Sequence, residues 1–226
     1  MTELDSIPDH VECEITKVSR LKGRGGKYRY EIFLGDYAIQ VHEDTMIKFR
    51  MMKGNLFTKQ ELVEVIQADE KQQAYVQSLT YLSLKPRTRH EIASRLRDKG
   101  WEDSLIEQTT ERLEKEGLID DGGFAEAWVS QRIGNHGKGK LWIKQELRAK
   151  GVSKTLIEQA LGHVTEDEEY ESGMKLAQKR WERLSEHTEE NKRKLAAFLM
   201  RRGYNFAVAS RIIRNLQSID EDIIEF

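Results

Sequence analysis

Three glycines recur at nearly constant spacing along this chain of 226 residues, each inside the same pattern of apolar residues. They are Gly100, Gly151 and Gly203, which are 51 and 52 residues apart. Apolar residues stand eight and four positions before each glycine, directly after it, and five and thirteen positions after it. Helical spacing inside a period of this length predicts a tandem array of small helical units. Each glycine is expected to end a helix with a positive φ.

The apolar residues of this pattern are interpreted as the core of three-helix units, without a chemical role. Capping signatures predict where the helices of each unit begin, because a Thr followed after three residues by Glu can form a capping box. The pairs Thr58–Glu61, Thr88–Glu91 and Thr165–Glu168 have this form, and further caps are predicted at Asp120–Asp121, Ser153, Asn205 and either Thr188 or Asn191.

The first part of the chain has a different composition. Residues 11–42 are rich in β-branched and aromatic residues, and a glycine-rich segment, KGRGGK at 22–27, and a Gly35-Asp36 turn divide them. This pattern predicts a three-stranded antiparallel meander. A meander of this size is not stable alone, so we expect it to pack on the following helices. Two are expected, one ending near Gln67 and one over 69–84.

The predicted fold is mostly α-helical: tandem three-helix repeats in an elongated array, preceded by a small N-terminal antiparallel β meander. The β-rich segment and a short helix are expected to occupy residues 1–68. The three repeats are assigned to residues 69–121, 122–164 and 165–226, and the last carries an acidic tail. Arrays of this kind usually present a surface to another macromolecule.

Composition agrees with a helical array and points away from secretion. The hydrophobic content is 38% and the charged content 34%, which suits thin modules with much exposed surface. Cys13 is the only cysteine, so neither an intramolecular disulfide nor a cysteine-based metal cluster can form. The polar start of the chain and the lack of a long apolar stretch predict a cytoplasmic protein that does not enter a membrane.

Positive charge is concentrated around the helices that precede the glycines, although the net charge is −2. Residues 131–154 contain seven basic residues and one acidic residue, and residues 192–214 contain seven basic residues and no acidic one. Cations beside a helix C-terminus complement its dipole, which accounts for one residue per repeat. A surface for a polyanion or an acidic partner is an equally good explanation of the rest. The nearby Trp101, Trp142 and Tyr204 are interpreted as core rather than as platforms for nucleic-acid bases.

The segment from Gly134 to Leu141, GNHGKGKL, resembles a phosphate-binding loop but lacks two of its requirements. Leu141 replaces the hydroxyl that binds Mg²⁺, and an amphipathic helix rather than a buried strand precedes the loop. We therefore reject a nucleotide site and interpret the segment as an exposed basic loop whose amides and lysines can meet an external anion. The six histidines are scattered, and no catalytic residue, cofactor site or metal site is assigned.

Three stretches carry a family resemblance: KPRTRHEIASRLRDKG, EGLIDDGGFAEAWVSQRI and IKQELRAKGVSKTLIEQAL. Together they resemble the RecX family of bacterial recombinase regulators, over roughly residues 74–218. The most specific part is Gly117 to Asp121 followed by Phe124-Ala125. The strand-rich start is similar to an extension of some Gram-positive members.

The resemblance implies a non-enzymatic protein, without cofactor, that binds the RecA recombinase and its filament on DNA. It implies inhibition of ATP hydrolysis and strand exchange, hence a role in homologous recombination, DNA repair and the SOS response. It also implies weak binding of single- and double-stranded DNA by a monomer. With the charge pattern, it suggests a partner and DNA surface made by Arg87, Arg95, Arg132, Lys138, Lys140, Lys144 and Arg148.

The alternative is a stand-alone DNA-binding protein that uses its three-helix units as helix-turn-helix readers. The sequence pI of about 6.4 is low for such a protein.

Overall fold

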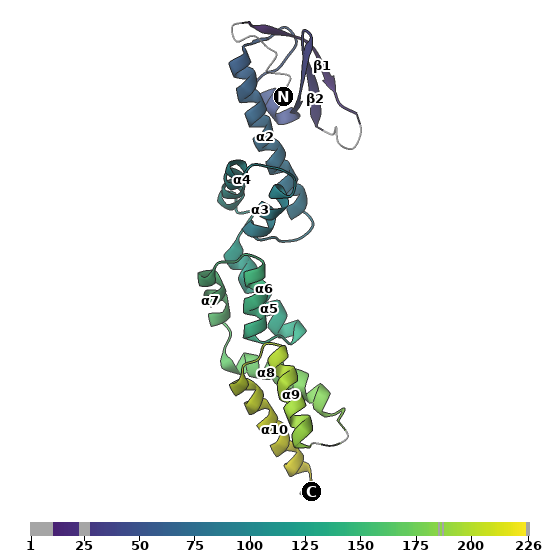
Figure 1. The fold of residues 1–226 in the computed structure, drawn as a ribbon, viewed down its shortest axis with the longest axis vertical. Coiled ribbons are helices and arrows are strands. Elements are labelled where there is room, and N and C mark those ends of the chain that lie inside the picture. The colour runs from purple at the N-terminus through teal and green to yellow at the C-terminus, as the bar shows by residue number, and fades with distance from the viewer. Residues whose placement is uncertain (1–10, 23–27, 185, 187, 225–226) are drawn as a thin grey trace. The chain divides into compact units, whose positions relative to one another are not determined.

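The computed structural model describes residues 11–22, 28–184, 186 and 188–224, and side chains up to residue 218 (Figure 1). The chain forms two compact units. Unit 1 combines Met1–Lys85 with Arg95–Lys115, and unit 2 combines Pro86–Ser94 with Glu116–Phe226. The division falls inside helix α3 (Arg89–Arg97), so each unit is described by itself.

Unit 1 contains a four-stranded antiparallel sheet and the helices that follow it. The strands are β1 (Cys13–Arg20), β2 (Arg29–Leu34), β3 (Tyr37–His42) and β4 (Leu56–Phe57), in the order β3-β2-β1-β4. The helices are α1 (Glu43–Lys48), α2 (Lys59–Leu82) and α4 (Asp103–Lys115). The predicted meander is confirmed, and β4 adds a short fourth strand beside β1. Most of the expected loop at 22–27 lies outside the described residues, but β1 and β2, which flank it, pair as predicted.

The core of the β module lies between the sheet and helix α2. Its fully buried residues alternate along the strands with more exposed ones, and they include Ile15, Ile32, Leu34 and Val41. This alternation is the period of two that a sheet with one covered face requires. Leu62 and Val65 of α2 complete the cluster, so the meander is stabilised by packing on the helix, as its small size requires.

The prediction of two separate helices over 58–84 is wrong, because α2 is continuous from Lys59 to Leu82. Asp69, expected near the start of the second helix, lies inside α2 and is 2% exposed. Its carboxylate accepts a hydrogen bond from the His42 backbone amide and another from the Arg29 guanidinium at 3.1 Å. A buried carboxylate requires such partners. Asp69 therefore attaches the helix to the sheet, and nothing in the sequence between 59 and 82 interrupts the helix.

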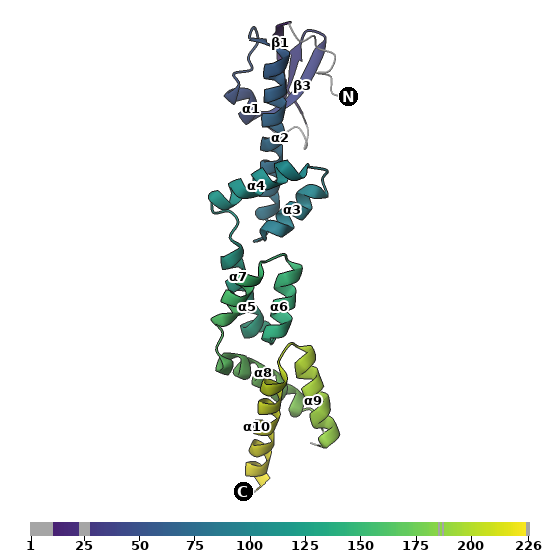
Figure 2. The same ribbon diagram turned by 60° about the vertical axis from the view of Figure 1, so that its left-hand side comes forward.

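Unit 2 contains two three-helix bundles, each with its own core (Figure 2). The first comprises α5 (Asp121–His136), α6 (Lys140–Ala149) and α7 (Lys154–Gly162). The second comprises α8 (Glu166–Trp181), α9 (Glu189–Arg201) and α10 (Phe206–Ile224). The predicted caps are confirmed at Asp120, Ser153, Thr165, Thr188 and Asn205.

All three repeat glycines adopt the predicted positive φ, with values of +86° at Gly100, +76° at Gly151 and +94° at Gly203. Two of them also lie against another repeat. A Cβ on Gly151 would be 2.9 Å from Cδ2 of His90 and closer still to its Cβ, and one on Gly203 would be 2.5 Å from the Cβ of Trp142. A Cβ on Gly100 would meet nothing within 4 Å. Glycine is thus required at Gly151 and Gly203 by contact as well as by conformation.

These contacts form two equivalent junctions in unit 2, where the second helix of one repeat begins on the last turn of the second helix of the next. At the first, Thr88 Oγ1 donates to the carbonyl of Lys150 at 2.7 Å. At the second, the amide of Gly139 donates to the carbonyl of Arg202 at 2.9 Å. The two glycines, Gly151 and Gly203, directly follow these carbonyls.

A carboxylate from the following repeat caps the helix at each junction. The amide of Arg89 donates to Asp121, and the amide of Lys140 donates to Glu169, both at 2.9 Å. Free amides at a helix start favour negative charge, so these contacts satisfy both helix and carboxylate. Burial raises the pKa of Asp121 despite this hydrogen bond. The junctions are therefore polar, specific joints rather than loose linkers.

The junction geometry predicts unequal costs for replacing the glycines by alanine. We expect Gly100→Ala to cost about 1 kcal/mol of stability, through backbone strain alone. Gly151→Ala and Gly203→Ala should cost about 2–4 kcal/mol, because overpacking adds to the strain. Urea denaturation followed by circular dichroism measures these values. Gly162→Ala is the control within unit 2, since an added Cβ there meets nothing within 4 Å. Equal costs at all three repeat glycines would contradict the close approach.

Candidate partner-binding surface of unit 2

Cations and aromatic rings alternate along unit 2, mainly between α5 and α6. Trp128 is flanked by two cations, with the Lys150 ammonium 4.6 Å and the Arg132 guanidinium 4.1 Å from its ring centre. Further along, Lys138 lies 3.5 Å above Trp142, and Arg202 lies 5.4 Å from the ring of Phe198. Contacts at these distances stabilise the cations over the rings. We use the name cation–aromatic row for the residues of these contacts: Lys150, Trp128, Arg132, Lys138, Trp142, Arg202 and Phe198.

Glu146 of α6 holds the centre of the cation–aromatic row together. Its carboxylate accepts hydrogen bonds from Nε1 of Trp128 at 2.9 Å and from Nε of Arg132 at 2.8 Å. Burial by itself raises the pKa of Glu146, but hydrogen bonds from the indoles of Trp142 and Trp128 and from Arg132 bring that pKa below its usual range. Glu146 therefore stays ionised and balances one of the cations.

Glu91 of α3 plays the same part at the first junction. It accepts a hydrogen bond from Nζ of Lys150 at 2.8 Å and lies 3.9 Å from the guanidinium of Arg87. Burial opposes ionisation of Glu91, but Lys150 and the Thr88 amide lower its pKa overall. Arg132 and Lys150 are thus paired with Glu146 and Glu91 inside the structure and present little free charge.

Positive charge remains uncompensated where the row reaches the second junction and on the outer face of α6. Burial lowers the pKa of Lys138, and the nearby positive charges of Arg202 and Arg132 lower it further. Burial is the largest cause of this shift, and Glu146 opposes the effect of the two arginines. Among the described residues, neither Lys138 nor Arg202 forms an ion pair. Arg148 is exposed on α6, and the described part of the chain offers it no ion pair. Lys144 is partly exposed and lies 3.8 Å from Glu158.

The structure separates the seven cations predicted from the sequence into different environments. Lys138 and Arg148 belong to the surplus just described, and Lys144 lies beside Arg148 on α6 but is paired with Glu158. Arg132 is paired with Glu146, and the Arg87 side chain is only 13% exposed. Arg95 belongs to unit 1, where it lies 5.7 Å from the ring of Tyr81. The seven residues therefore do not form one continuous patch within either unit.

Two expectations about the segment from Gly134 to Leu141 are wrong. Lys140 is not an exposed loop lysine, because its Nζ donates to the carbonyl of Val164 at 2.7 Å. The amides of Gly139 and Lys140 already donate to Arg202 and Glu169, so they cannot receive an external anion. Trp142 was also assigned to the core, but it is 36% exposed, whereas Tyr204 is buried as predicted. Only the tertiary contacts at the junction reveal these differences.

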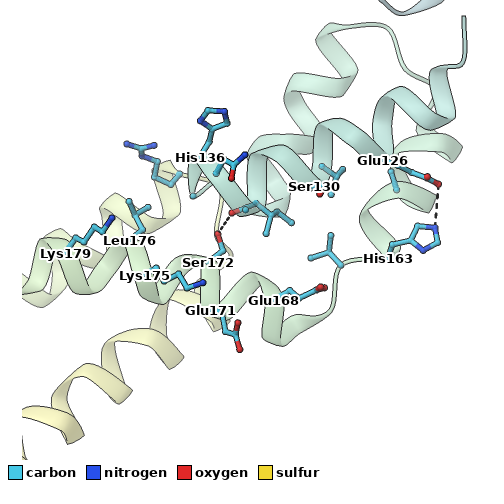
Figure 3. Close-up of a pocket in the computed structure, with 18 residues that line it drawn as sticks. Glu126, Ser130, His136, His163, Glu168, Glu171, Ser172, Lys175, Leu176 and Lys179 are labelled. Carbon is cyan, nitrogen blue, oxygen red and sulfur yellow. Dashed lines mark hydrogen bonds and ion pairs between the residues drawn. The ribbon is translucent and has the colours of Figure 1, made fainter. Parts of the chain in front are cut away.

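A hollow of about 820 Å³ lies beside the second junction, between the ends of α5 and α7 and helix α8 (Figure 3). Lys175, Lys179 and His136 lie toward one side of it, and Glu126 with His163 lies at the other. The Ser172 hydroxyl donates to the carbonyl of Ile133 at 2.6 Å and ties α8 to α5. The lining is therefore mixed in charge. Within the described ranges, no three His, Cys, Asp or Glu side chains come together as metal ligands.

The comparison with known families identifies the repeats. Models of the first, second and third three-helix domains of RecX match residues 74–113, 120–161 and 166–213. The chain belongs to the RecX family. Across the described residues, every helix is too short or too polar to span a lipid bilayer.

Curated relatives and solved structures agree with this membership. The chain is 32% identical to a protein named Regulatory protein RecX from Limosilactobacillus reuteri, over 88% of this chain and 76% of the relative. It is 30% identical to the protein of the same name from Bacillus subtilis, over 92% and 79% of the two chains. A crystal structure of regulatory protein RecX matches with a TM-score of 0.71 and 31% identity, covering 88% of this chain and 98% of the other. A crystal structure of RecX from Lactobacillus salivarius matches with a TM-score of 0.63 and 30% identity, covering 66% and 98%.

We predict that Lys140→Ala lowers the free energy of unfolding of unit 2 by about 1–2 kcal/mol, because it removes a charge-assisted hydrogen bond to Val164. Arg148→Ala should change it by less than about 0.5 kcal/mol, as is usual for exposed surface positions. Thermal and urea denaturation compare the two variants. Equal stability of both would show that the Lys140 contact contributes nothing.

The lowered pKa values of Glu91 and Glu146 predict acid sensitivity of unit 2. Because folding favours their ionised forms, their contribution is present above the usual glutamate pKa of about 4.3 and is lost as the pH falls through the lower folded-state pKa. We expect Glu91→Gln and Glu146→Gln to be less stable than wild type at pH 7 and to lose less stability on acidification. Urea denaturation between pH 7 and pH 3 measures this, and curves parallel to wild type would contradict it.

Proposed function

We propose that this chain is a non-enzymatic regulator that binds a RecA recombinase, both free and as its filament on DNA, and inhibits ATP hydrolysis and strand exchange. Membership of the RecX family supports a regulatory role. A regulator of this kind needs no chemistry of its own. It acts by binding one state of the filament more tightly than another, which shifts the population between them. We further propose that it acts as a cytoplasmic monomer with weak affinity for single- and double-stranded DNA.

The observation that carries the proposal is the uncompensated positive charge of unit 2. It belongs to Lys138, Arg148 and Arg202, for which the described residues offer no ion pair, and Lys144 lies beside them on α6 with Glu158 at 3.8 Å. The filament offers phosphates and acidic side chains as complementary groups, and charge complementarity speeds association and sets orientation. Arg132, Lys140 and Arg87 of unit 2 support this surface from within, and we propose Arg95 of unit 1 as a separate contact with the partner.

Charge reversal on α6 tests the proposal without disturbing the junctions. In Lys144→Glu/Arg148→Glu, we expect about tenfold weaker inhibition of the DNA-dependent ATPase of the cognate recombinase at low salt, a loss typical of a few disrupted charge contacts. Thermal stability should change little, because exposed charges contribute little to folding. The difference from wild type should shrink at high salt, where screening already weakens the interaction. Lys140 is left unchanged because its ammonium donates to the carbonyl of Val164, so reversing its charge would also destabilise the fold.

The matched control is Lys48→Glu/Lys53→Glu, which makes the same charge change at exposed positions of unit 1. It should inhibit the ATPase as wild type does. If both double variants lose inhibition equally, net charge rather than the α6 surface governs binding. Wild-type protein that affects neither ATP hydrolysis nor strand exchange would overturn the proposed function. Tight, sequence-preferring DNA binding with a steep salt dependence would then favour a stand-alone DNA-binding protein.

A further inference from the structure

Exposed apolar side chains gather at the second junction. Leu141, Trp142, Met200 and Phe206 are 53%, 36%, 49% and 71% exposed. Scattered single apolar residues are normal on a protein surface, but a cluster of them indicates an interaction site. We call these four residues the junction patch.

Backbone contacts bring the four residues of the junction patch to one place. The amide of Leu141 donates to the carbonyl of Gly203 at 3.0 Å, and the backbone of Trp142 lies directly on Gly203. The carbonyl of Met200 accepts from the amide of Gly203 at 2.9 Å. Phe206 follows three residues after this glycine, at the first position of α10. Three chain segments therefore present apolar side chains around a single glycine.

The repeat architecture does not require apolar residues here, as the first junction shows. The positions at the same distances from its glycines hold His90, Glu91, Arg148 and Lys154. Three of these are exposed and Glu91 is half-buried, and all four are polar or charged. Around Gly100, the positions that correspond to Met200 and Phe206 hold Arg97 and Asp103, which form an ion pair at 2.9 Å. The same helix–glycine–helix turn thus forms with charged residues, so folding alone does not explain the junction patch.

The junction patch has a positive border. Lys138 lies over the ring of Trp142, Arg201 is exposed beside Met200 in sequence, and Arg202 precedes Gly203. Glu146, which accepts hydrogen bonds from residues of the cation–aromatic row, is already paired with Arg132. An apolar centre with a border of cations fits a partner whose apolar side chains are bordered by carboxylates.

We propose that the junction patch is the docking site for the recombinase protein itself, through an apolar ridge bordered by Asp and Glu side chains. This inference rests on the proposed function and assigns the protein contact to the apolar side chains of the second junction, whose border shares Lys138 and Arg202 with the positive surface of α6. Leu141 and Met200 cannot stack on bases, and Lys138 covers one face of the Trp142 ring, so Phe206 is the only one of the four with a freely exposed ring. This argues against single-stranded DNA as the occupant, because such DNA is held by stacking of successive bases on several rings. A second copy is disfavoured because a two-fold pairing would set the positive borders of two copies against each other.

The first junction supplies the variant that tests the inference. Met200→Arg/Phe206→Lys introduces the residues that the corresponding positions carry there, where the same turn folds with them. Added positive charge can itself attract an acidic partner, so Met200→Gln/Phe206→Gln is measured beside it. We expect both variants to bind DNA-free recombinase at least about tenfold more weakly than wild type, because aromatic and Met side chains are enriched at interfaces and a few residues carry most of the binding energy. The Gln variant should bind single-stranded DNA within about twofold of wild type, since DNA affinity rests mainly on cations.

The control is Leu84→Gln, which removes an apolar side chain that is 74% exposed elsewhere, and it should bind like wild type. Circular dichroism checks that all variants keep the wild-type melting temperature. If the Gln variant binds recombinase within about twofold of wild type, the inference is overturned, while the proposed function stands. It is also overturned if the variant loses DNA affinity but keeps recombinase affinity, or if sedimentation shows that the patch only pairs copies of this chain. Wild-type protein that does not bind recombinase overturns the proposed function instead.

Discussion

The structure of unit 2 depends on close approaches at two glycines: Gly151 lies against the side chain of His90, and Gly203 lies against the backbone of Trp142. At each glycine, the second helix of one repeat begins on the end of the second helix of the next, at a distance that no Cβ permits. A carbonyl accepts from the Thr88 hydroxyl at the first junction and from the Gly139 amide at the second. At both, a carboxylate of the following repeat accepts from an amide at the start of the helix. Because the polar groups on both sides of a junction must all be paired, few relative placements of two neighbouring repeats are possible. The junction therefore fixes the positions of the side chains around it.

The same joint carries different side chains at its two occurrences, and this difference separates structure from function. At the first junction, charged residues pair with each other, as Glu91 does with Lys150. At the second, four apolar side chains are exposed, and Lys138, Arg201 and Arg202 lie beside them. Because the first junction forms with charged side chains, a junction of this kind does not need exposed apolar side chains to be stable. We propose that a partner accounts for what the second junction adds.

Local features could be predicted from the sequence, whereas long-range contacts could not. The period of the glycines, their positive φ and the caps at Ser153 and Asn205 depend on a few neighbouring residues. Asp69 and Lys140 have partners 24 or more residues away, so the local sequence wrongly predicts a helix start at Asp69 and an exposed loop lysine at Lys140. The same limit applies to the candidate surface. Composition reveals that residues 131–154 are basic, but only the fold shows which cations face Glu91 or Glu146 and which remain available.

Side-chain footprinting tests the central claim, that the second junction and its surroundings meet the recombinase filament. The protein is exposed to hydroxyl radicals with and without the filament, and oxidation is read by mass spectrometry. Met200 and Met52 are a matched pair, 49% and 51% exposed, one at the junction and one in the β module. Oxidation of Met200, Trp142 and Phe206 should slow several-fold in the complex, while Met52 reacts as before. Equal rates for Met200 with and without filament, in protein that is bound, would contradict the account.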